Sequence, residues 1–463
     1  MIDGNPIKIR KGLDIPIGGA AERRQMSMLD EVRYAVRPMD HVGMVPRLLV
    51  AEGDSVCVGT PLVEDKGNDA LRLVSPVSGT VTAVVRGEKR RLLSVVVTSN
   101  GKQEQEVREH PDALQCCADE LREHMVAVGL WSLLEQRPFG IVPKRDARPK
   151  ALFLSGFDSG PLAVDMDYML QGREEDFAYG VAVLRRLIET IYLSLDWRRQ
   201  RDSLLAKTEG VEVRYFDGPH PAGLVGTQIN KIAPLNKGEQ VWTIDLQSVA
   251  IIGHYFRTGE LDLQRLVALC GPTVPRPCYV LLRQGACIEQ MASLVHPCPS
   301  GTPSNQEGEF VRFVGGDVLS GVGLERDGFM PAKAAKLCVL PEGNRPDLLG
   351  WLRPNIHKYS HSRTFLSGLL RRPSRLTLDF DTGLHGGHRP LFVTGDFERL
   401  VPLDIYPMQL IKACMAGDME QMEELGIYEV EPEDLALCEF ADTSKTEIQK
   451  VVRDALEQLR KEG

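Results

Sequence analysis

The sequence predicts an α+β protein of several domains, because its pattern changes three times along the chain. Short valine-rich segments separated by turn residues come first, and alternating strand and helix patterns follow them. A second strand-rich region then precedes a helical end. Since 463 residues are enough for about three domains with hydrophobic cores, we expect a small β sandwich, a parallel α/β domain, a compact β-grasp-like module and a helical C-terminal region.

The first predicted domain covers residues 37–100 and follows an N-terminal segment of residues 1–36. Valines alternate with polar residues between turn pairs such as Gly53-Asp54, where glycine admits a positive φ and aspartate bonds the local backbone. Alternation of this kind is expected for half-buried strands, so we predict a small all-β sandwich or barrel.

An Asp-Lys pair within this β domain is a candidate functional feature. The run from Gly53 to Lys66, followed by S-P-V-S-G-T-V from Ser75, closely resembles a biotinyl/lipoyl domain. In that family a lysine at an exposed hairpin tip takes the prosthetic group, and Asp65 and Lys66 occupy that place here. The alternative is a reused β scaffold in which Lys66 is a vestigial, solvated lysine. We favour the alternative because no tethering linker flanks the domain.

The α/β domain is predicted for residues 101–271. A buried strand at 151–154 precedes a strong helical pattern over Asp176–Leu195, and a strand at Val211–Phe216 follows at once. Strand, helix and strand in that order indicate a parallel sheet, which a further strand at Val241–Leu246 extends.

The remaining chain divides into three predicted parts. Residues 272–345 are strand-rich with glycine turns, which is typical of a β-grasp-like module, and residues 346–402 form an irregular connector. Residues 403–463 are predicted to be helical. There Ser444-Lys445-Thr446-Glu447 matches a capping box, in which the serine accepts from the third helical amide and the glutamate reaches back.

Charge and composition disfavour several functional classes. The net charge of −9 argues against a sequence-independent grip on nucleic acid or anionic lipid, since both need a basic surface. No apolar run approaches the ~18 residues of a membrane span, and the start lacks the features of a secretory signal. We therefore expect a cytoplasmic protein whose membrane association goes through partners. The ten cysteines form no C-x-x-C pair, so no zinc or iron–sulfur site is predicted.

The loop Gly218–Gly226, which reads G-P-H-P-A-G-L-V-G, is a candidate ligand loop. Its prolines, Pro219 and Pro221, remove amides that a phosphate would need, and neither G-x-G-x-x-G nor a P-loop motif occurs in the chain. A dinucleotide site is therefore weakly supported. His220, held between the two prolines, could hydrogen-bond a quinone carbonyl or could be a surface residue of a rigid loop.

The sequence G-F-D-S-G at residues 156–160 looks like a nucleophile elbow, but its central residue is Asp158 and not serine. An acyl-transfer serine is therefore not expected. We predict a turn in which the Asp158 carboxylate bonds local amides.

The stretch D-F-D-T-G-L-H-G-G-H has the chemistry of metal ligands. It offers Asp379, Asp381, His385 and His388. The glycines between the two histidines do not secure the short, well-oriented ligand distances that a metal needs, so no metal site is expected.

Seven motifs are spread along nearly the whole chain, and they are Ile9–Ala20, Arg137–Phe139, Phe157–Ala163, Gly218–Thr227, Val241–Asp245, Val401–Ile405 and Glu433–Leu437. In that order they resemble one family, the A subunit of the sodium-translocating NADH:quinone reductase (Na+-NQR). The resemblance implies a lipoyl-like module, a Rossmann-like domain akin to the flavin-carrying subunit of respiratory complex I, a ubiquitin-like (SLBB) β-grasp domain and a helical C-terminal region.

The resemblance also implies a place in an inner-membrane complex that oxidises NADH, reduces ubiquinone and exports sodium. The chain would lie on the cytoplasmic side, attached through partner subunits, chiefly the membrane-embedded, flavin-carrying B subunit. The FMN, FAD and iron–sulfur centres are expected on those partners, and the isolated chain is not expected to be catalytic.

The chain departs from its flavin-bearing relatives, which are the C subunit of the Rnf electron-transport complex and the complex I subunit. Those relatives carry a glycine-rich loop for FMN or NADH, and clustered cysteines. At the corresponding place this chain has Trp131 and Leu133, in a helix predicted from Ala113 to about Leu134 and ended by Arg137-Pro138. We therefore expect no tightly bound redox cofactor.

Two functions are the main candidates from the sequence. The first is a quinone-contacting subunit, whose candidate quinone or partner contacts are Asp158, His220, Gly223, Gly226 and Trp242. The second is a docking subunit that holds the membrane subunits and the NADH-oxidising subunit in register. A lipoyl-type carrier at Lys66 is a third option.

Overall fold

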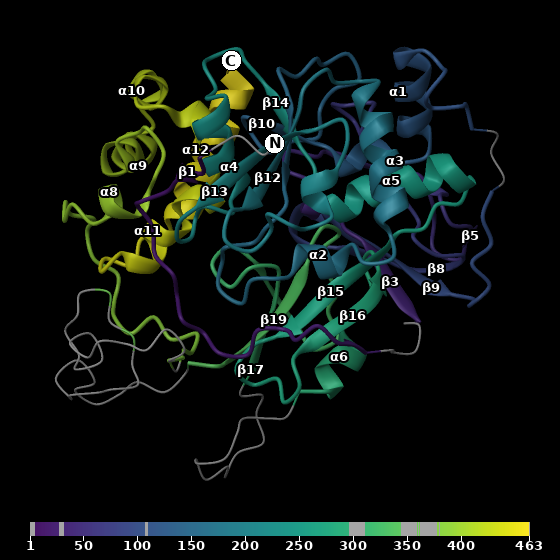
Figure 1. Ribbon diagram of the computed structural model, residues 1–463. Coiled ribbons are helices and arrows are strands. Elements are labelled where there is room, and N and C mark those ends of the chain that lie inside the picture. The colour runs from purple at the N-terminus through teal and green to yellow at the C-terminus, as the bar shows by residue number, and fades with distance from the viewer. Residues whose placement is uncertain are drawn as a thin grey trace, which may run out of the picture.

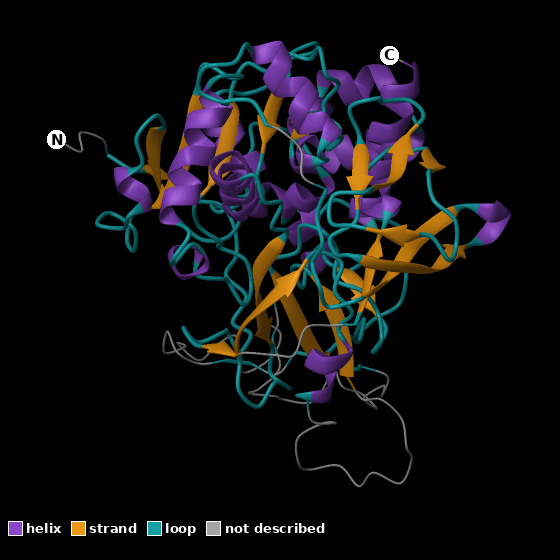
Figure 2. Ribbon diagram, turned by 90° about the vertical axis from the view of Figure 1, so that its right-hand side faces the viewer, coloured by secondary structure: helices purple, strands orange, loops and turns teal. Residues whose placement is uncertain are grey.

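The computed structural model describes residues 5–26, 32–106, 110–295, 311–343, 359, 361, 377–378 and 380–462. These residues contain four sheets and a C-terminal group of helices (Figure 1). Many of the helices gather in the upper half of Figure 2, above the strands of the second sheet. Within the described ranges, no helix is both long and apolar enough to cross a membrane.

The first sheet is mainly parallel. Its strands are β1 (Ile7–Lys8), β10 (Glu135–Arg137), β11 (Leu152–Ser155), β12 (Ile191–Asp196), β13 (Glu212–Asp217) and β14 (Val241–Thr243). Their order is β1-β13-β12-β11-β14-β10, with β10 antiparallel at one edge.

Helices cover both faces of this sheet. They are α1 (Ala118–Ala127), α3 (Glu174–Arg185), α4 (Val225–Ile232) and α5 (Leu246–Thr258), with the 3-10 turns η3 (Leu130–Leu133) and η4 (Leu205–Lys207). The short α2 (Met166–Met169) packs elsewhere, because its Met169 contacts a cluster that contains Leu266 and Tyr279. Along β11, Leu152 and Leu154 belong to the core that contains α3 and α5, whereas Phe153 packs with α4. Parallel strands that are covered on both sides are expected to be apolar throughout.

The second sheet is mixed and lies in the lower half of Figure 1. Its strands are β2 (Gln25–Met26), β15 (Gln264–Cys270), β16 (Cys278–Arg283), β17 (Val311–Gly315), β18 (Val322–Leu324) and β19 (Lys336–Pro341), and α6 (Glu289–Ser293) follows β16. The order β18-β17-β19-β15-β16-β2 places β15 parallel to β19. Because β15 belongs here, this sheet begins before the domain boundary predicted between residues 271 and 272.

Two small antiparallel sheets form the β module. One has the order β3-β9-β8-β5 and the other β4-β6-β7. Their strands are β3 (Arg33–Val36), β4 (Pro46–Leu48), β5 (Ser55–Val56), β6 (Pro61–Asp65), β7 (Arg72–Val74), β8 (Gly79–Arg86) and β9 (Leu92–Ser99), with η1 (Pro38–Asp40) and η2 (Glu88–Arg90). Val63 and Val97 of the two sheets share one buried cluster with Leu184 of α3, so the module packs on the α/β domain through a continuous core.

The N-terminal segment joins three of the four sheets. It supplies β1 to the first sheet, β2 to the second and β3 to the β module. Between β1 and β2, Ile17 forms an isolated β-bridge with Leu378. Figure 1 draws it in purple across the lower left of the molecule. Residues 1–36, predicted as a segment apart from the domains, therefore contribute strands to three of them.

The helical C-terminal region has its own core, which includes Leu410, Val452 and Leu456. Its helices are α8 (Phe397–Leu400), α9 (Pro407–Ala416), α10 (Met419–Glu424), α11 (Ala436–Ala441) and α12 (Ile448–Glu462), with the turns η5 (Ile427–Glu429) and η6 (Pro432–Leu435). The first of these, α8, falls within residues 346–402, which were predicted to be irregular.

The helix predicted over Asp176–Leu195 is too long. It ends at Arg185, and β12 begins at Ile191. A strand buried on both faces is as continuously apolar as a buried helix, so hydrophobic periodicity does not separate the two. The strand predicted over Val241–Leu246 likewise ends at Thr243, where the chain turns into α5.

The predicted capping box at Ser444–Glu447 is wrong. The Ser444 hydroxyl donates to Pro390 O at 3.2 Å, and α12 begins beyond this segment. The amide of Gln449, in the first turn of α12, donates instead to Glu439 Oε2 of α11 at 2.8 Å. A carboxylate from a neighbouring helix thus caps the start of α12. A local sequence pattern does not reveal a cap that comes from another helix.

Candidate functional site

The carboxyl ends of β11 and β13 bring two loops together at one edge of the first sheet, where open α/β folds bind their ligands. The loop after β11 carries Asp158 and Ser159, and the loop after β13 carries His220. Ser159 Oγ accepts a hydrogen bond from Gly223 N at 2.7 Å and lies 3.1 Å from His220 Nδ1, to which its hydroxyl can donate. The amide of His220 donates to Asp14 Oδ1 at 2.9 Å.

Lys336 reaches this edge from β19 of the second sheet. Its Nζ lies 2.8 Å from Asp158 Oδ2, 2.6 Å from Asp317 Oδ2 and 3.1 Å from Pro161 O. The ammonium therefore uses its three donors on the chain itself. Burial would lower the pKa of Lys336, but the two carboxylates outweigh burial and hold that pKa well above the usual lysine value.

The Asp158 carboxylate forms the local turn that the sequence predicts. It accepts from Gly160 N at 2.7 Å and from Val164 N at 3.2 Å. Burial would raise the pKa of Asp158, but the Lys336 ammonium outweighs it, so the pKa lies below the usual aspartate value. Burial lowers the pKa of His220 more than the nearby carboxylates raise it, and the imidazole is therefore neutral at pH 7.

The predicted contact residues are not all at this edge. Asp158, His220 and Gly223 meet there, and His220 is 4% exposed. Gly226 lies in the first turn of α4 and faces the helical C-terminal region, where a Cβ would come within 2.2 Å of Asp434 Oδ1. Trp242 lies in β14 with 0% exposure, so it offers no surface to a quinone or a partner.

Trp131 is also a core residue. Gly129, at φ +80°, separates α1 from η3, so the helix predicted from Ala113 to Leu134 is interrupted. The buried indole of Trp131 donates to Pro143 O at 2.8 Å and packs edge-on against Trp242, with ring centroids 5.4 Å apart.

Lys66 is exposed at the hairpin tip that follows β6. The tip is docked on the α/β domain, because Asn68 Nδ2 donates to Val142 O at 2.9 Å and Arg145 pairs with Asp69 at 3.0 Å. A docked tip is poorly suited to carrying a prosthetic group between distant sites.

His385 and His388 each have a partner within the protein. His385 Nε2 lies 2.8 Å from Asp381 Oδ1, and His388 Nδ1 lies 2.9 Å from Lys445 O. Across the described part of the chain, no group of three His, Cys, Asp or Glu side chains is placed to hold a metal. Asp379 lies outside the described residues.

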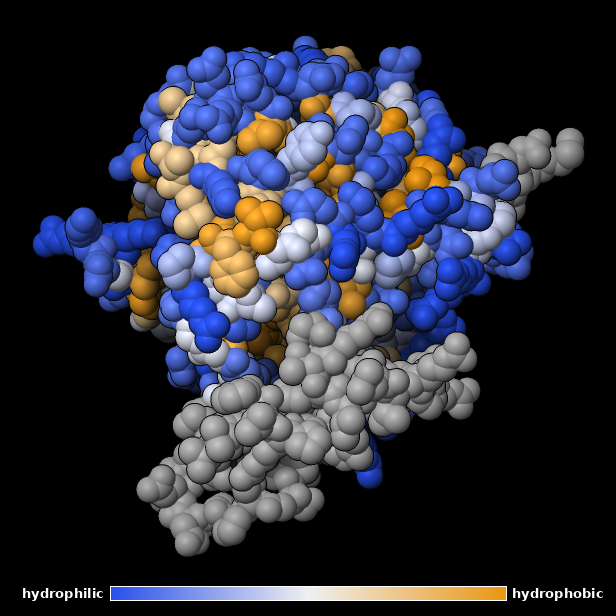
Figure 3. All heavy atoms as spheres, turned by 90° about the vertical axis from the view of Figure 1, so that its left-hand side faces the viewer, coloured by the Kyte–Doolittle hydropathy of each residue, from blue (hydrophilic) through white to orange (hydrophobic). Residues whose placement is uncertain are grey.

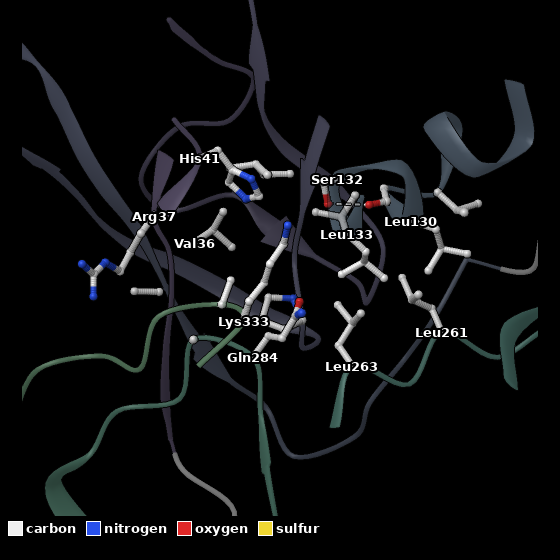
Figure 4. Close-up of a pocket in the computed structure, with 18 residues that line it drawn as sticks. Val36, Arg37, His41, Leu130, Ser132, Leu133, Leu261, Leu263, Gln284 and Lys333 are labelled. Atoms are coloured by element: carbon white, nitrogen blue, oxygen red, sulfur yellow. Dashed lines mark hydrogen bonds between the residues drawn. The ribbon is translucent and has the colours of Figure 1, made fainter. Parts of the chain in front are cut away.

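A cavity of about 50 Å³ lies where the β module, η3 and the second sheet meet (Figure 4), and no sequence motif marks it. In Figure 4, Lys333 extends toward His41, Gln284 lies beside it, and Arg37 points away. Apolar side chains complete the wall, among them Val36, Val74, Leu130, Leu133, Leu261 and Leu263.

The nitrogen groups of this cavity have few partners. Gln284 Nε2 is buried without a hydrogen-bond partner, and none is found for the Lys333 ammonium among the described residues. Burial lowers the pKa of Lys333, and burial together with the Lys333 charge lowers the pKa of His41 to about 3. Arg37 is engaged elsewhere, with Phe329 O at 2.9 Å. The cavity therefore presents nitrogen donors between apolar walls.

Comparison with known proteins identifies the family. Residues 7–100 match the NqrA N-terminal barrel-sandwich hybrid domain, and residues 116–261 match the NqrA second alpha/beta domain. The A subunit of the Na(+)-translocating NADH-quinone reductase of Actinobacillus succinogenes is 37% identical over 462 residues, which cover 99% of this chain and 100% of the relative. The chain belongs to the NqrA family, the A subunits of the Na(+)-translocating NADH-quinone reductases.

Other NqrA proteins are equally similar. Those of Yersinia pseudotuberculosis and Pasteurella multocida are 36% and 37% identical over 463 residues, with 99% of this chain and 100% of each relative covered. The barrel-sandwich match confirms the predicted lipoyl-like module. A solved structure, an NAD+-reducing NiFe-hydrogenase in the H2-reduced state, is 12% identical with a TM-score of 0.38, over 76% of this chain and 62% of that one.

Proposed function

We propose that the chain is a peripheral subunit of the sodium-translocating NADH:quinone reductase, on the cytoplasmic side of the bacterial inner membrane. There it supports ubiquinone reduction coupled to sodium export, without a redox cofactor of its own. Partner subunits, chiefly the membrane-embedded B subunit, carry the FMN, FAD and iron–sulfur centres. The isolated chain is not catalytic. Membership of the NqrA family supports a place in this complex. The contacts at the carboxyl edge of the first sheet support the absence of a redox cofactor.

The filled carboxyl edge of the first sheet carries this proposal. A flavin or dinucleotide phosphate at such an edge relies on backbone amides that still have a hydrogen bond to give. Here the amides of Gly160, Val164 and Gly223 already donate to side chains of the same edge. The ammonium of Lys336, a natural phosphate partner, is shared between two carboxylates. The chain thus satisfies these groups internally.

The visible absorption spectrum of the purified chain tests the absence of a cofactor. We expect no flavin or iron–sulfur bands, and NADH oxidation in the whole complex but not in the isolated chain. A flavin or cluster signature in the chain would overturn the proposal.

A direct quinone contact is a second candidate function, and the cavity around Lys333 favours it. A quinone has two carbonyl acceptors on an apolar ring, and this cavity has nitrogen donors between apolar walls. Its volume of about 50 Å³ is below the ~150 Å³ that accommodates a benzene ring. We therefore propose that one carbonyl edge of the ring enters. His220 is the poorer candidate, because it is buried and lies against Ser159.

Photolabelling with a photoreactive ubiquinone tests this contact. We expect labelled peptides that contain residues 36–41 or 333, competition by unlabelled ubiquinone, and several-fold weaker labelling of Lys333→Met and Gln284→Leu. Lys150→Met is the matched control, since Lys150 is an exposed lysine paired with Glu239 at 3.2 Å. Labelling that is absent, or that unlabelled quinone does not compete, removes the contact.

If the quinone contact is removed in this way, the remaining candidate function is the docking of partner subunits. The outer face of the C-terminal helices carries apolar side chains among polar ones (Figure 3), and Tyr406 and Met415 are 67% and 53% exposed. Exposed apolar side chains of this kind suit a partner surface. Co-purification of the B subunit with Met415→Lys, compared with the unaltered chain, measures this contribution. An intact mass equal to that of the unmodified chain would exclude a prosthetic group on Lys66 and, with it, the carrier function.

A further inference from the structure

Three of the family motifs meet at the junction between the first sheet and the helical C-terminal region. Arg137 ends β10, Gly226 lies in the first turn of α4, and Glu433 and Asp434 lie in η6. The Arg137 guanidinium is 5% exposed and lies 3.0 Å from Asp434 Oδ2, and it also pairs with Glu433. These residues are far apart in the sequence, so the junction exists only in the folded chain.

A second ion pair completes the junction. Arg453 of α12 lies 2.7 Å from Glu431 Oε2 and donates to Phe139 O at 2.9 Å. The Glu431 side chain is 4% exposed and that of Asp434 is 1% exposed. One oxygen of each carboxylate, Glu431 Oε1 and Asp434 Oδ1, is buried without a hydrogen-bond partner.

Acidic groups outnumber basic ones here. The carboxylates of Glu135, Glu431, Glu433 and Asp434 face the two guanidiniums of Arg137 and Arg453. The other titratable side chains that face the cluster are Tyr428 and Glu429 of η5, and His220 of the loop after β13. A buried carboxylate without enough positive charge is costly, and the usual remedy is a bound proton.

The backbone of two glycines lies close to both carboxylates. A Cβ on Gly226 would come within 2.2 Å of Asp434 Oδ1, and one on Gly140 within 3.1 Å of Glu431 Oε2. The space beside Arg137 and Glu431 measures about 10 Å³, which is room for about one water molecule. A bound proton neutralises one of these carboxylates without occupying any of this space.

We propose that this junction holds a proton on Glu431 below neutral pH, and that loss of the proton as the pH rises through neutrality loosens the helical C-terminal region from the α/β domain. Burial, opposed by Arg137 and Arg453, raises the pKa of Glu431 to about 7. Burial also raises the pKa of Glu433 and Asp434.

The sign of the pH dependence follows from this shift. The folded carboxyl group of Glu431 has a pKa of about 7, above the 4.5 of an unperturbed glutamate, so the folded state binds the proton more tightly than the unfolded state. The stabilisation is therefore complete below pH 4.5 and is lost as the pH rises toward 7. The folded state itself loses the proton around pH 7, so packing of the C-terminal region should weaken as the pH rises through that value.

Hydrogen–deuterium exchange of the full chain at about pH 5.5 and about pH 8, corrected for intrinsic exchange rates, tests the proposal. We expect the protection of α9, α11 and α12 to fall by about tenfold or more at the higher pH. The strands β8 and β9 of the β module serve as the internal reference and should not change. Equal protection of the C-terminal helices at both pH values overturns the proposal.

Glu431→Gln assigns the effect, because the amide has the shape of the protonated carboxyl group. We expect this variant to keep the same protection at both pH values. Glu447→Gln is the matched control, since Glu447 is 66% exposed, and it should behave as the unaltered chain. If Glu431→Gln responds to pH as the unaltered chain does, the proton is not on Glu431.

Infrared spectroscopy of the unaltered chain tests the proposal without the need for a variant to fold. A buried protonated carboxyl group has a carbonyl band that a carboxylate lacks. We expect this band at about pH 5.5 and its loss at about pH 8. Its absence at the lower pH would overturn the proposal.

Discussion

Two lysines three residues apart, Lys333 and Lys336, show how differently one segment can use the same side chain. Lys336 is buried between two carboxylates and a carbonyl at the edge of the first sheet, with every donor bonded. Lys333 extends into a cavity where no partner is found among the described residues. The contrast teaches that a charged side chain with incomplete contacts is a candidate ligand group, whereas one with complete contacts holds the fold together.

Replacing each lysine with methionine tests the contrast most directly. Lys336→Met leaves the partly buried Asp158 and Asp317 without their cation, so we expect a loss of about 3 kcal/mol in the free energy of unfolding. Lys333→Met removes an ammonium without a described partner and should change stability by less than about 1 kcal/mol. Denaturant midpoints of the two variants measure the difference. Equal losses would break the comparison.

The pH dependence of His41 sharpens the description of the cavity. The folded imidazole has a pKa of about 3, against 6.5 in the unfolded chain, so protons favour the unfolded state as the pH falls below 6.5. Each pH unit costs about 1.4 kcal/mol, so about 2 kcal/mol is lost between pH 6.5 and about pH 5.

His41→Gln should lack this part of the acid sensitivity. Stability curves of both proteins over that pH range measure it. Parallel curves would mean that the His41 imidazole binds a proton in the folded state as readily as in the unfolded state, and would contradict its neutral state in the fold.

A pair of glutamines extends the comparison, and one of them, Gln284, has the smallest expected effect. Gln228 Nε2, at the filled edge, donates to Ser155 Oγ at 2.8 Å and to Ala222 O at 3.3 Å, so Gln228→Leu should cost about 1–3 kcal/mol. Gln284 Nε2, in the cavity, is buried without a partner. Gln284→Leu should therefore be neutral or stabilising by up to about 1 kcal/mol. Thermal unfolding of both variants checks the order, and a larger loss for Gln284→Leu would contradict it.

Local patterns predicted those elements whose partners lie nearby in the chain. The alternating valines predicted the β module, and the strand–helix–strand order predicted the parallel sheet. The turn at Asp158 was correct because its amide partners, Gly160 and Val164, follow within a few residues. The prediction failed where burial overrides periodicity, as at Ile191, which begins a strand and does not end a helix.

The candidate site was predicted in part. The sequence singled out Asp158, His220 and Gly223, which the fold does bring together. It also singled out Trp242, which is a core residue, and it missed Lys336 and the cavity around Lys333. Neither lysine belongs to a motif. Their partners or neighbours come from distant segments, so no local spacing marks them.

The sequence by itself determined the family of this protein, the order of its modules and the turns that a side chain closes over a few residues. Tertiary structure alone decided which charges are satisfied. Lys336, Glu431 and Gln284 acquire their character from burial and from groups far along the chain, which raise or lower a pKa or leave a donor unpaired. Solvation and charge act through space, and the fold sets those distances.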